Sequence, residues 1–81
     1  MENRVAIVAI VVEDLAKAEE VNKVLHDYGD YIIGRMGIPH RERGISLISV
    51  ALDGPSDVVS ALSGKIGCIE GVSAKAVYTK G

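Results

Sequence analysis

The side chains best suited to binding an anion gather in one short segment, residues 35–43, with the sequence RMGIPHRER. In a chain whose formal net charge is −2, this segment holds four basic residues: Arg35, His40, Arg41 and Arg43. Guanidinium groups bind phosphates and carboxylates through paired hydrogen bonds, so the segment could hold an anionic ligand or an acidic partner. The other interpretation is a solvated hairpin tip, or a salt-bridged interface between subunits, with Glu42 as a local partner of the arginines.

Residues that commonly serve as nucleophiles or metal ligands are few. Cys68 is the only cysteine, and the two histidines are His26 and His40. They cannot form a structural zinc site in one chain without carboxylates or a second subunit. We expect Cys68 to be a small buried thiol, His26 to lie on a helix surface, and Glu13 and Asp14 to cap a helix. No nucleophile elbow, Cys/His pair or glycine-rich phosphate loop occurs. We therefore expect no enzyme activity, catalytic residue, metal or cofactor.

The composition limits the class of protein. The chain has 81 residues, of which 48% are hydrophobic, which is the size of one small domain over residues 1–81 and too apolar for disorder. The lone cysteine predicts a reducing, cytoplasmic setting. The longest apolar run, residues 5–12, is too short to cross a membrane, and the acidic pair after it does not fit a signal peptide. The acidic net charge gives no surface for nucleic acid across the whole domain.

The elements that must position these side chains follow from the hydrophobic pattern. β-Branched runs predict strands over residues 4–12, 30–38, 44–52 and 72–79. Apolar residues at spacings of three and four predict helices over residues 14–28 and 53–67. We expect Asp14 to cap the first helix, Gly29 to end it in a left-handed conformation, Pro55 to occupy the first helical position of the second, and Gly67 to end that one.

The order of these elements is β-α-β-β-α-β. Two right-handed crossovers then give a four-stranded antiparallel sheet, with the first and third strands central and both helices on one face. The expected fold is therefore α+β with a ferredoxin-like arrangement.

Such a fold leaves one sheet face without helices. On the third strand, Ile48, Val50 and Leu52 should face the helices, whereas Ile45, Leu47 and Ser49 should face away. The first strand is apolar on both sides. On the outer strands we expect a more polar rim made by Arg35, Ser73, Lys75 and Thr79. Because monomers rarely expose so much apolar surface, we expect this face to join copies in a homo-oligomer, a dimer or a tetramer. The alternatives are a substrate pocket in a small enzyme on a dimeric scaffold and a purely structural oligomerisation domain.

The same topology serves RNA-recognition modules, whose third strand begins Arg-Gly-aromatic-x-aromatic. Here Arg43 and Gly44 are in frame, but Ile45 and Leu47 stand where the aromatic residues belong. Aliphatic side chains offer no flat ring for base stacking, so we expect no direct nucleic-acid binding.

With this topology, three segments carry a family resemblance: residues 29–39 (GDYIIGRMGIP), residues 41–46 (RERGIS) and Gly71-Val72-Ser73 with Lys75. Over essentially its whole length the chain resembles the small iron-only hydrogenase system regulators. That resemblance implies an ACT-like fold, similar to the oligomerising C-terminal domain of nickel-responsive repressors. It also implies a bacterial cytoplasmic regulator associated with iron-only hydrogenase maturation. Our leading hypothesis is a non-enzymatic, ACT-like homo-oligomer that binds a small effector, a partner protein, or both.

The chain departs from those relatives at their best-known sites. His26, His40 and Cys68 do not reproduce the histidine-rich nickel site, and the first strand begins by Arg4, where the repressors would first carry a DNA-binding segment. The turn Val12-Glu13-Asp14-Leu15 lacks the glycine found where many ACT domains hold an amino acid. The resemblance therefore does not imply nickel sensing or direct DNA binding.

Overall fold

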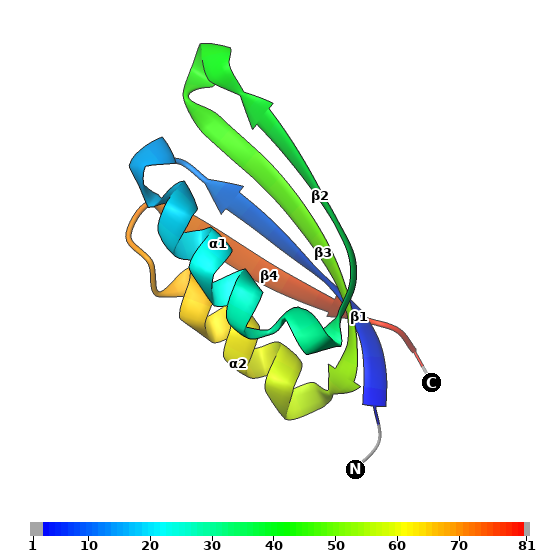
Figure 1. The fold of residues 1–81 in the computed structure, drawn as a ribbon. Helices are drawn as coiled ribbons and strands as arrows, with labels where there is room; N and C mark the ends of the chain where they lie inside the picture. The colour runs from blue at the N-terminus through cyan, green and yellow to red at the C-terminus, as the bar shows by residue number, and fades with distance from the viewer. Residues whose placement is uncertain (1–2, 81) are drawn as a thin grey trace.

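The computed structural model describes residues 3–80. Within them lie two α-helices and four strands, in the order β1 (Asn3–Val12), α1 (Ala18–Asp27), β2 (Ile32–His40), β3 (Ile45–Pro55), α2 (Ser56–Gly67) and β4 (Val72–Tyr78). The strands form one antiparallel sheet in the order β2-β3-β1-β4. Both helices cover the same face of it (Figure 1). The fold is α+β and ferredoxin-like, with the first and third strands central, as predicted.

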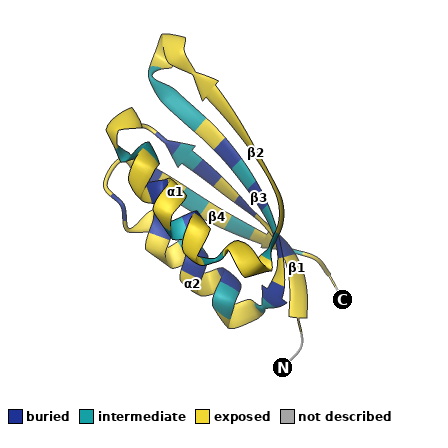
Figure 2. Ribbon diagram, in the orientation of Figure 1, coloured by how far each residue is buried: buried dark blue, intermediate teal, exposed yellow. Residues whose placement is uncertain are grey.

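The core lies between the helices and the sheet, mostly over the two central strands, with β4 adding Val72 (Figure 2). Alternate residues of β1 and β3 point into it because successive strand side chains face opposite sides of a sheet. The fully or almost fully buried side chains are Ala6, Val8, Ile10, Val12, Val21, Leu25, Ile48, Val50, Leu52, Val59, Leu62, Ile66, Ile69 and Val72. The prediction that Ile48, Val50 and Leu52 face the helices is confirmed.

The first helix is built in two pieces. A 3-10 turn, η1 (Leu15–Lys17), precedes α1, and Asp14 caps it, since its Oδ1 accepts a hydrogen bond from the Ala16 N–H at 3.0 Å. Gly29 is not left-handed, so that expectation is wrong. The chain continues from Gly29 directly into a second 3-10 turn, η2 (Gly29–Tyr31), which requires a negative φ.

The second helix begins at Ser56, three residues after the start of the predicted range and one position after Pro55, the expected first helical residue. Pro55 is the last residue of β3, with φ −58° and ψ 145°, and it pairs with Asn3 of β1. It therefore stands at the N-cap rather than inside the helix. Gly67 is the last helical residue, as expected.

The β2–β3 hairpin extends further than its sequence predicts. Pro39 and His40 belong to β2, and the tip is a 3-10 turn, η3 (Arg41–Arg43). Gly44 closes the tip with φ 64° and ψ 31°, a left-handed conformation that suits glycine, and its N–H donates to the Arg41 carbonyl at 3.1 Å. The helices leave β2 uncovered, and after Ile32 every β2 residue is exposed (Figure 2).

A β-bulge in β2 reverses which face of the sheet its following side chains point to. Ile32 pairs with Leu52 and Gly34 with Ala51, so β2 advances two residues where β3 advances one, and Ile33 is the extra residue. Beyond the bulge, Arg35 lies opposite Val50, a residue that faces the helices. The prediction that Arg35 belongs to the helix-free face is therefore wrong.

Candidate functional site

The helix-free side of the sheet, here called the open face, is a regular lattice of side chains. From β2 across to β4, its successive rows are Ile38, Leu47, Val11 and Ser73; Met36, Ser49, Ala9 and Lys75; and Gly34, Ala51, Ile7 and Val77. His40 and Ile45 extend it towards the hairpin tip, and Val5 and Asp53 extend it towards the other end. Ile45, Leu47 and Ser49 thus lie where the sequence placed them.

Apolar side chains reach both edges of the open face. Met36 on β2 is 60% exposed, Ile7 on β1 is 49% exposed, and Val77 on β4 is 63% exposed. The predicted polar rim is therefore wrong on β2, where Arg35 does not lie on this face, and is confirmed in part on β4, where Ser73 and Lys75 lie on it beside Val77. Met36 and Ile38 reach this face only because of the bulge, whereas Val77 could have been found from its alternation with Lys75.

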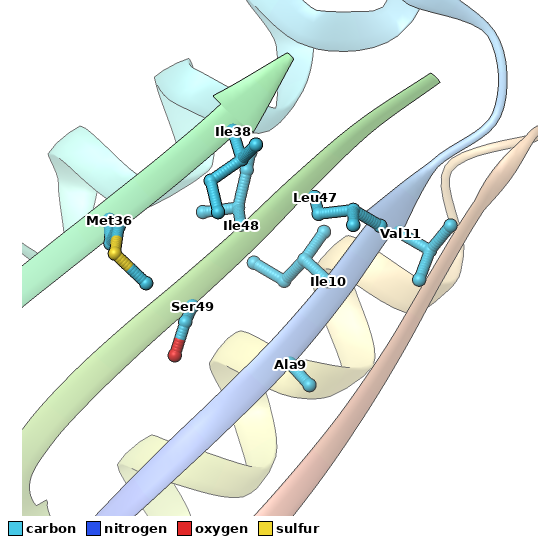
Figure 3. Close-up of a pocket in the computed structure, with 8 residues that line it drawn as sticks. All are labelled: Ala9, Ile10, Val11, Met36, Ile38, Leu47, Ile48 and Ser49. Carbon is cyan, nitrogen blue, oxygen red and sulfur yellow. The ribbon is translucent and has the colours of Figure 1, made fainter. Parts of the chain in front are cut away.

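A shallow hollow lies in the upper half of the open face. Its cavity volume is about 160 Å³, and its open-face lining comes from β1, β2 and β3: Ala9, Val11, Met36, Ile38, Leu47 and Ser49 (Figure 3). The Ser49 hydroxyl is the one polar side-chain group among them. Ala9 and Ser49, which have small side chains, line the end of the hollow farther from the hairpin tip. Val11, Ile38 and Leu47 line the end nearer to the tip (Figure 3). The hollow therefore suits an apolar side chain or a small apolar group.

Ionisable side chains on the open face do not converge. Among residues 3–80 they are Asp53, Lys75 and His40, and the strand register places them at the lower end, on the β4 edge and near the hairpin tip. General acid–base catalysis needs a group within hydrogen-bond reach of the reacting atom and usually a second group that orients it. This lattice offers an apolar contact surface rather than an acid–base pair.

The four predicted basic site residues divide into two places. His40, Arg41 and Arg43 lie together at the exposed hairpin tip. Arg35 lies five residues back along β2, roughly 17 Å at about 3.3 Å per residue. There its Nη2 donates a hydrogen bond to Asn22 Oδ1 of α1 at 2.8 Å. The structure therefore gathers three of the four residues, and the fourth joins β2 to a helix.

A second polar cluster, which the sequence did not reveal, joins the ends of β1 and β4 to α2. Arg4 Nη2 donates to the Thr79 carbonyl at 2.9 Å, and the guanidinium lies 4.9 Å from the centre of the Tyr78 ring. The Tyr78 hydroxyl is 3.0 Å from Ser60 Oγ. These contacts connect the start of β1, the end of β4 and α2 on the side of the sheet that the helices cover, so we assign them a structural role.

The sulfur and imidazole groups are exposed and separate. Cys68 is exposed, contrary to the expected buried thiol, because the chain leaving α2 turns Ile69 into the core instead. His26 is exposed on α1, as predicted. Among residues 3–80, no three His, Cys, Asp or Glu side chains are placed to hold a metal ion. No helix in the same range is both long and apolar enough to cross a membrane.

Comparison with known proteins places the chain in a family. Residues 4–76 match the family model described as "TM1266-like: Iron-only hydrogenase system regulator, putative". The chain belongs to this family. The uncharacterized protein TM1266 from Thermotoga maritima is similar along its whole length, at 44% identity and a TM-score of 0.92, with 98% of this chain and 100% of that one covered.

Two further solved structures share the fold of this family member at low identity. A formyltetrahydrofolate deformylase from Pseudomonas putida KT2440 matches at 14% identity and a TM-score of 0.65, over 90% of this chain but 28% of that one. CPII, a nitrogen regulatory PII-like protein from Thiomonas intermedia K12 solved with ADP, AMP and bicarbonate, matches at 16% identity and a TM-score of 0.51, over 99% and 100% of the two chains. A comparison with curated proteins gives no match.

Proposed function

We propose that the chain is a non-enzymatic, cytoplasmic regulator in an iron-only hydrogenase system, and that it works as a homo-oligomer joined through the open face. The family description supports the regulatory role. The observation that supports the oligomer is the continuous apolar open face, which contains Ile7, Met36, Leu47 and Val77 as exposed side chains. Each square ångström of such surface removed from water contributes about 25 cal/mol, so covering the face favours association.

Light scattering coupled to size exclusion at micromolar concentration tests the oligomer. We expect a mass that is a multiple of the 8.6 kDa chain. Ile7→Lys places a charge in the lowest full row of the open face and should give the monomer mass, because a buried unpaired charge opposes association. Ala61→Lys is the matched control, since Ala61 is exposed on α2, and it should keep the wild-type mass. A monomeric wild type would contradict this proposal.

We propose in addition that the hairpin tip, His40, Arg41 and Arg43, binds an anionic effector or an acidic partner. Three basic side chains at one exposed turn support this, because together they can pair with phosphate or carboxylate oxygens. Thermal-shift screening with amino acids, nucleotides and divalent metals should give a higher melting temperature with an anionic compound. The double variant Arg41→Ala, Arg43→Ala should lose that shift and keep the wild-type mass. A flat screen would instead favour a purely structural oligomerisation domain.

A further inference from the structure

We propose that two copies pack open face against open face about a two-fold axis that runs parallel to the strands, between β1 and β3. The inference rests on the proposed homo-oligomer and adds which residue of one copy meets which residue of the other. Such an axis places β3 over β1 of the second copy and β2 over β4, and it keeps each row of the lattice against the same row. Aligned packing of two twisted sheets keeps facing strands within about 30° of each other.

This axis matches large side chains with small ones. Gly34 of β2 lies opposite Val77 of β4 in the second copy, and the most exposed apolar side chain of that row thus meets a residue with no side chain. In the same row Ile7 lies opposite Ala51. In the upper row Ile38 lies opposite Ser73. Because the contact is two-fold symmetric, each of these pairs occurs twice, and interdigitation of this kind is how two sheets fill the space between them.

The hollow on the open face also lies opposite a side chain that can fill it. It lies over β3 between the rows of Leu47 and Ser49, so the second copy presents β1 to it, with Val11 and Ala9 in those rows. A valine side chain can enter an apolar hollow of about 160 Å³. Ala9 and Ser49, both small, lie opposite each other beside the axis and allow the two backbones to approach.

The charge of Lys75 argues against a two-fold axis that runs perpendicular to the strands in the plane between the two sheets, here called a crossing axis. A crossing axis through the middle row sets Lys75 directly against Lys75 of the second copy, and like charges facing each other in an interface are unfavourable. A crossing axis half a row lower sets Lys75 against Val77, and Leu47 against Asp53. The strand-parallel axis instead sets Lys75 against Met36 on the outer strand β2. There the lysine methylenes can lie along the thioether while the ammonium reaches solvent beyond the sheet edge.

The area is sufficient for a specific contact. Four strands spaced by about 4.8 Å and seven residues at about 3.3 Å give a face of roughly 400–500 Å², so two faces remove on the order of 1,000 Å² from solvent. That value is at the lower limit for a specific protein–protein interface. We therefore expect a dimer that dissociates on dilution.

Site-directed cross-linking tests the axis. In a Cys68→Ser background, the pair Gly34→Cys and Val77→Cys is treated with a short bis-maleimide, and linked peptides are identified by mass spectrometry. A Cβ at Gly34 meets nothing within 4 Å in the single chain, so the variant should fold. Within one chain the two positions lie on opposite outer strands, so the strand-parallel axis should give links between residues 34 and 77 of different chains.

The matched control pair is Gly34→Cys and Ile38→Cys, which a crossing axis through the middle row would link between chains and the strand-parallel axis would not. If the protein has a dimer mass, and the control pair gives 34–38 links between chains while the test pair gives no 34–77 links between chains, the axis is overturned and the proposed homo-oligomer stays intact. A dimer mass with neither link also overturns the axis. A monomer mass for the Cys68→Ser parent overturns both the axis and the homo-oligomer, so the two failures are distinguishable.

Discussion

Arg35 of β2 and Asn22 of α1 are joined by a 2.8 Å hydrogen bond on the helix side of the sheet. The bond exists because the bulge at Ile33 turns Arg35 away from the open face. Two consequences follow. The open face keeps Met36 and Ile38 in place of an arginine, and β2, which the helices do not cover, gains a side-chain link to the helix layer.

Arg35→Ala should lower the free energy of unfolding by up to about 1 kcal/mol, because one solvent-exposed hydrogen bond is lost. Asn22→Ala should have a similar effect, and the double variant should be no worse than either single one, since both remove the same bond. Chemical denaturation measures the three values. The oligomer mass should not change, and a loss of mass in Arg35→Ala would place Arg35 in the interface instead.

Gly71→Ala should destabilise the protein by roughly 1–2 kcal/mol. Gly71 has φ +81°, and a Cβ there would lie 3.0 Å from the Asp14 Cβ in the turn that leads into α1. Gly64→Ala is the control. Gly64 lies inside α2 with nothing within 4 Å of an added Cβ, so this change should stabilise the helix by about 0.5–1 kcal/mol. Thermal unfolding of both variants should therefore shift in opposite directions.

Leu62→Ala and Leu47→Ala should differ in how their effects depend on protein concentration. Leu62 is fully buried in the core, so its loss should cost about 2–5 kcal/mol at any concentration. Leu47 is 41% exposed in the single chain. If a second copy covers it, Leu47→Ala weakens association, and the difference in melting temperature from wild type should grow as the protein is concentrated. A concentration-independent difference for Leu47→Ala would argue that the open face is uncovered.

Lys65 should stabilise the fold at every pH below its ordinary pKa, and this stabilisation should be lost in alkaline solution. The Lys65 ammonium lies 5.1 Å from the centre of the Tyr28 ring, and its interaction with Tyr28 raises the pKa of Lys65 above its ordinary value of 10.5. Because the folded-state pKa is the higher one, the stabilisation is complete below pH 10.5 and disappears as the pH rises through the folded-state pKa. Denaturation of Lys65→Gln at pH 7 should show a loss relative to wild type that is absent at high pH. Lys23→Gln, at an exposed position of α1, serves as the control.

Much of the fold follows from local pattern. The β-branched runs and the three-and-four spacing of Val21 and Leu25 predict the elements, and alternation in the unbroken strand β3 predicts that Val50 faces the core and Leu47 the open face. These predictions hold because, in a regular element, the backbone repeat alone sets the direction of each side chain. The hairpin tip is also local, since His40, Arg41 and Arg43 are adjacent in sequence.

What the sequence by itself determined is therefore the order of elements, the sheet topology and the existence of an apolar helix-free face. The tertiary structure alone decided which β2 residues belong to that face, where Cys68 points, and how Gly29 continues the chain. The reason is physical. A bulge is a property of two paired strands, so its effect on Arg35 and Met36 arises only when β2 adopts its register on β3. The exposure of Cys68 likewise depends on Ile69 packing into a core that forms only when α2 docks on the sheet.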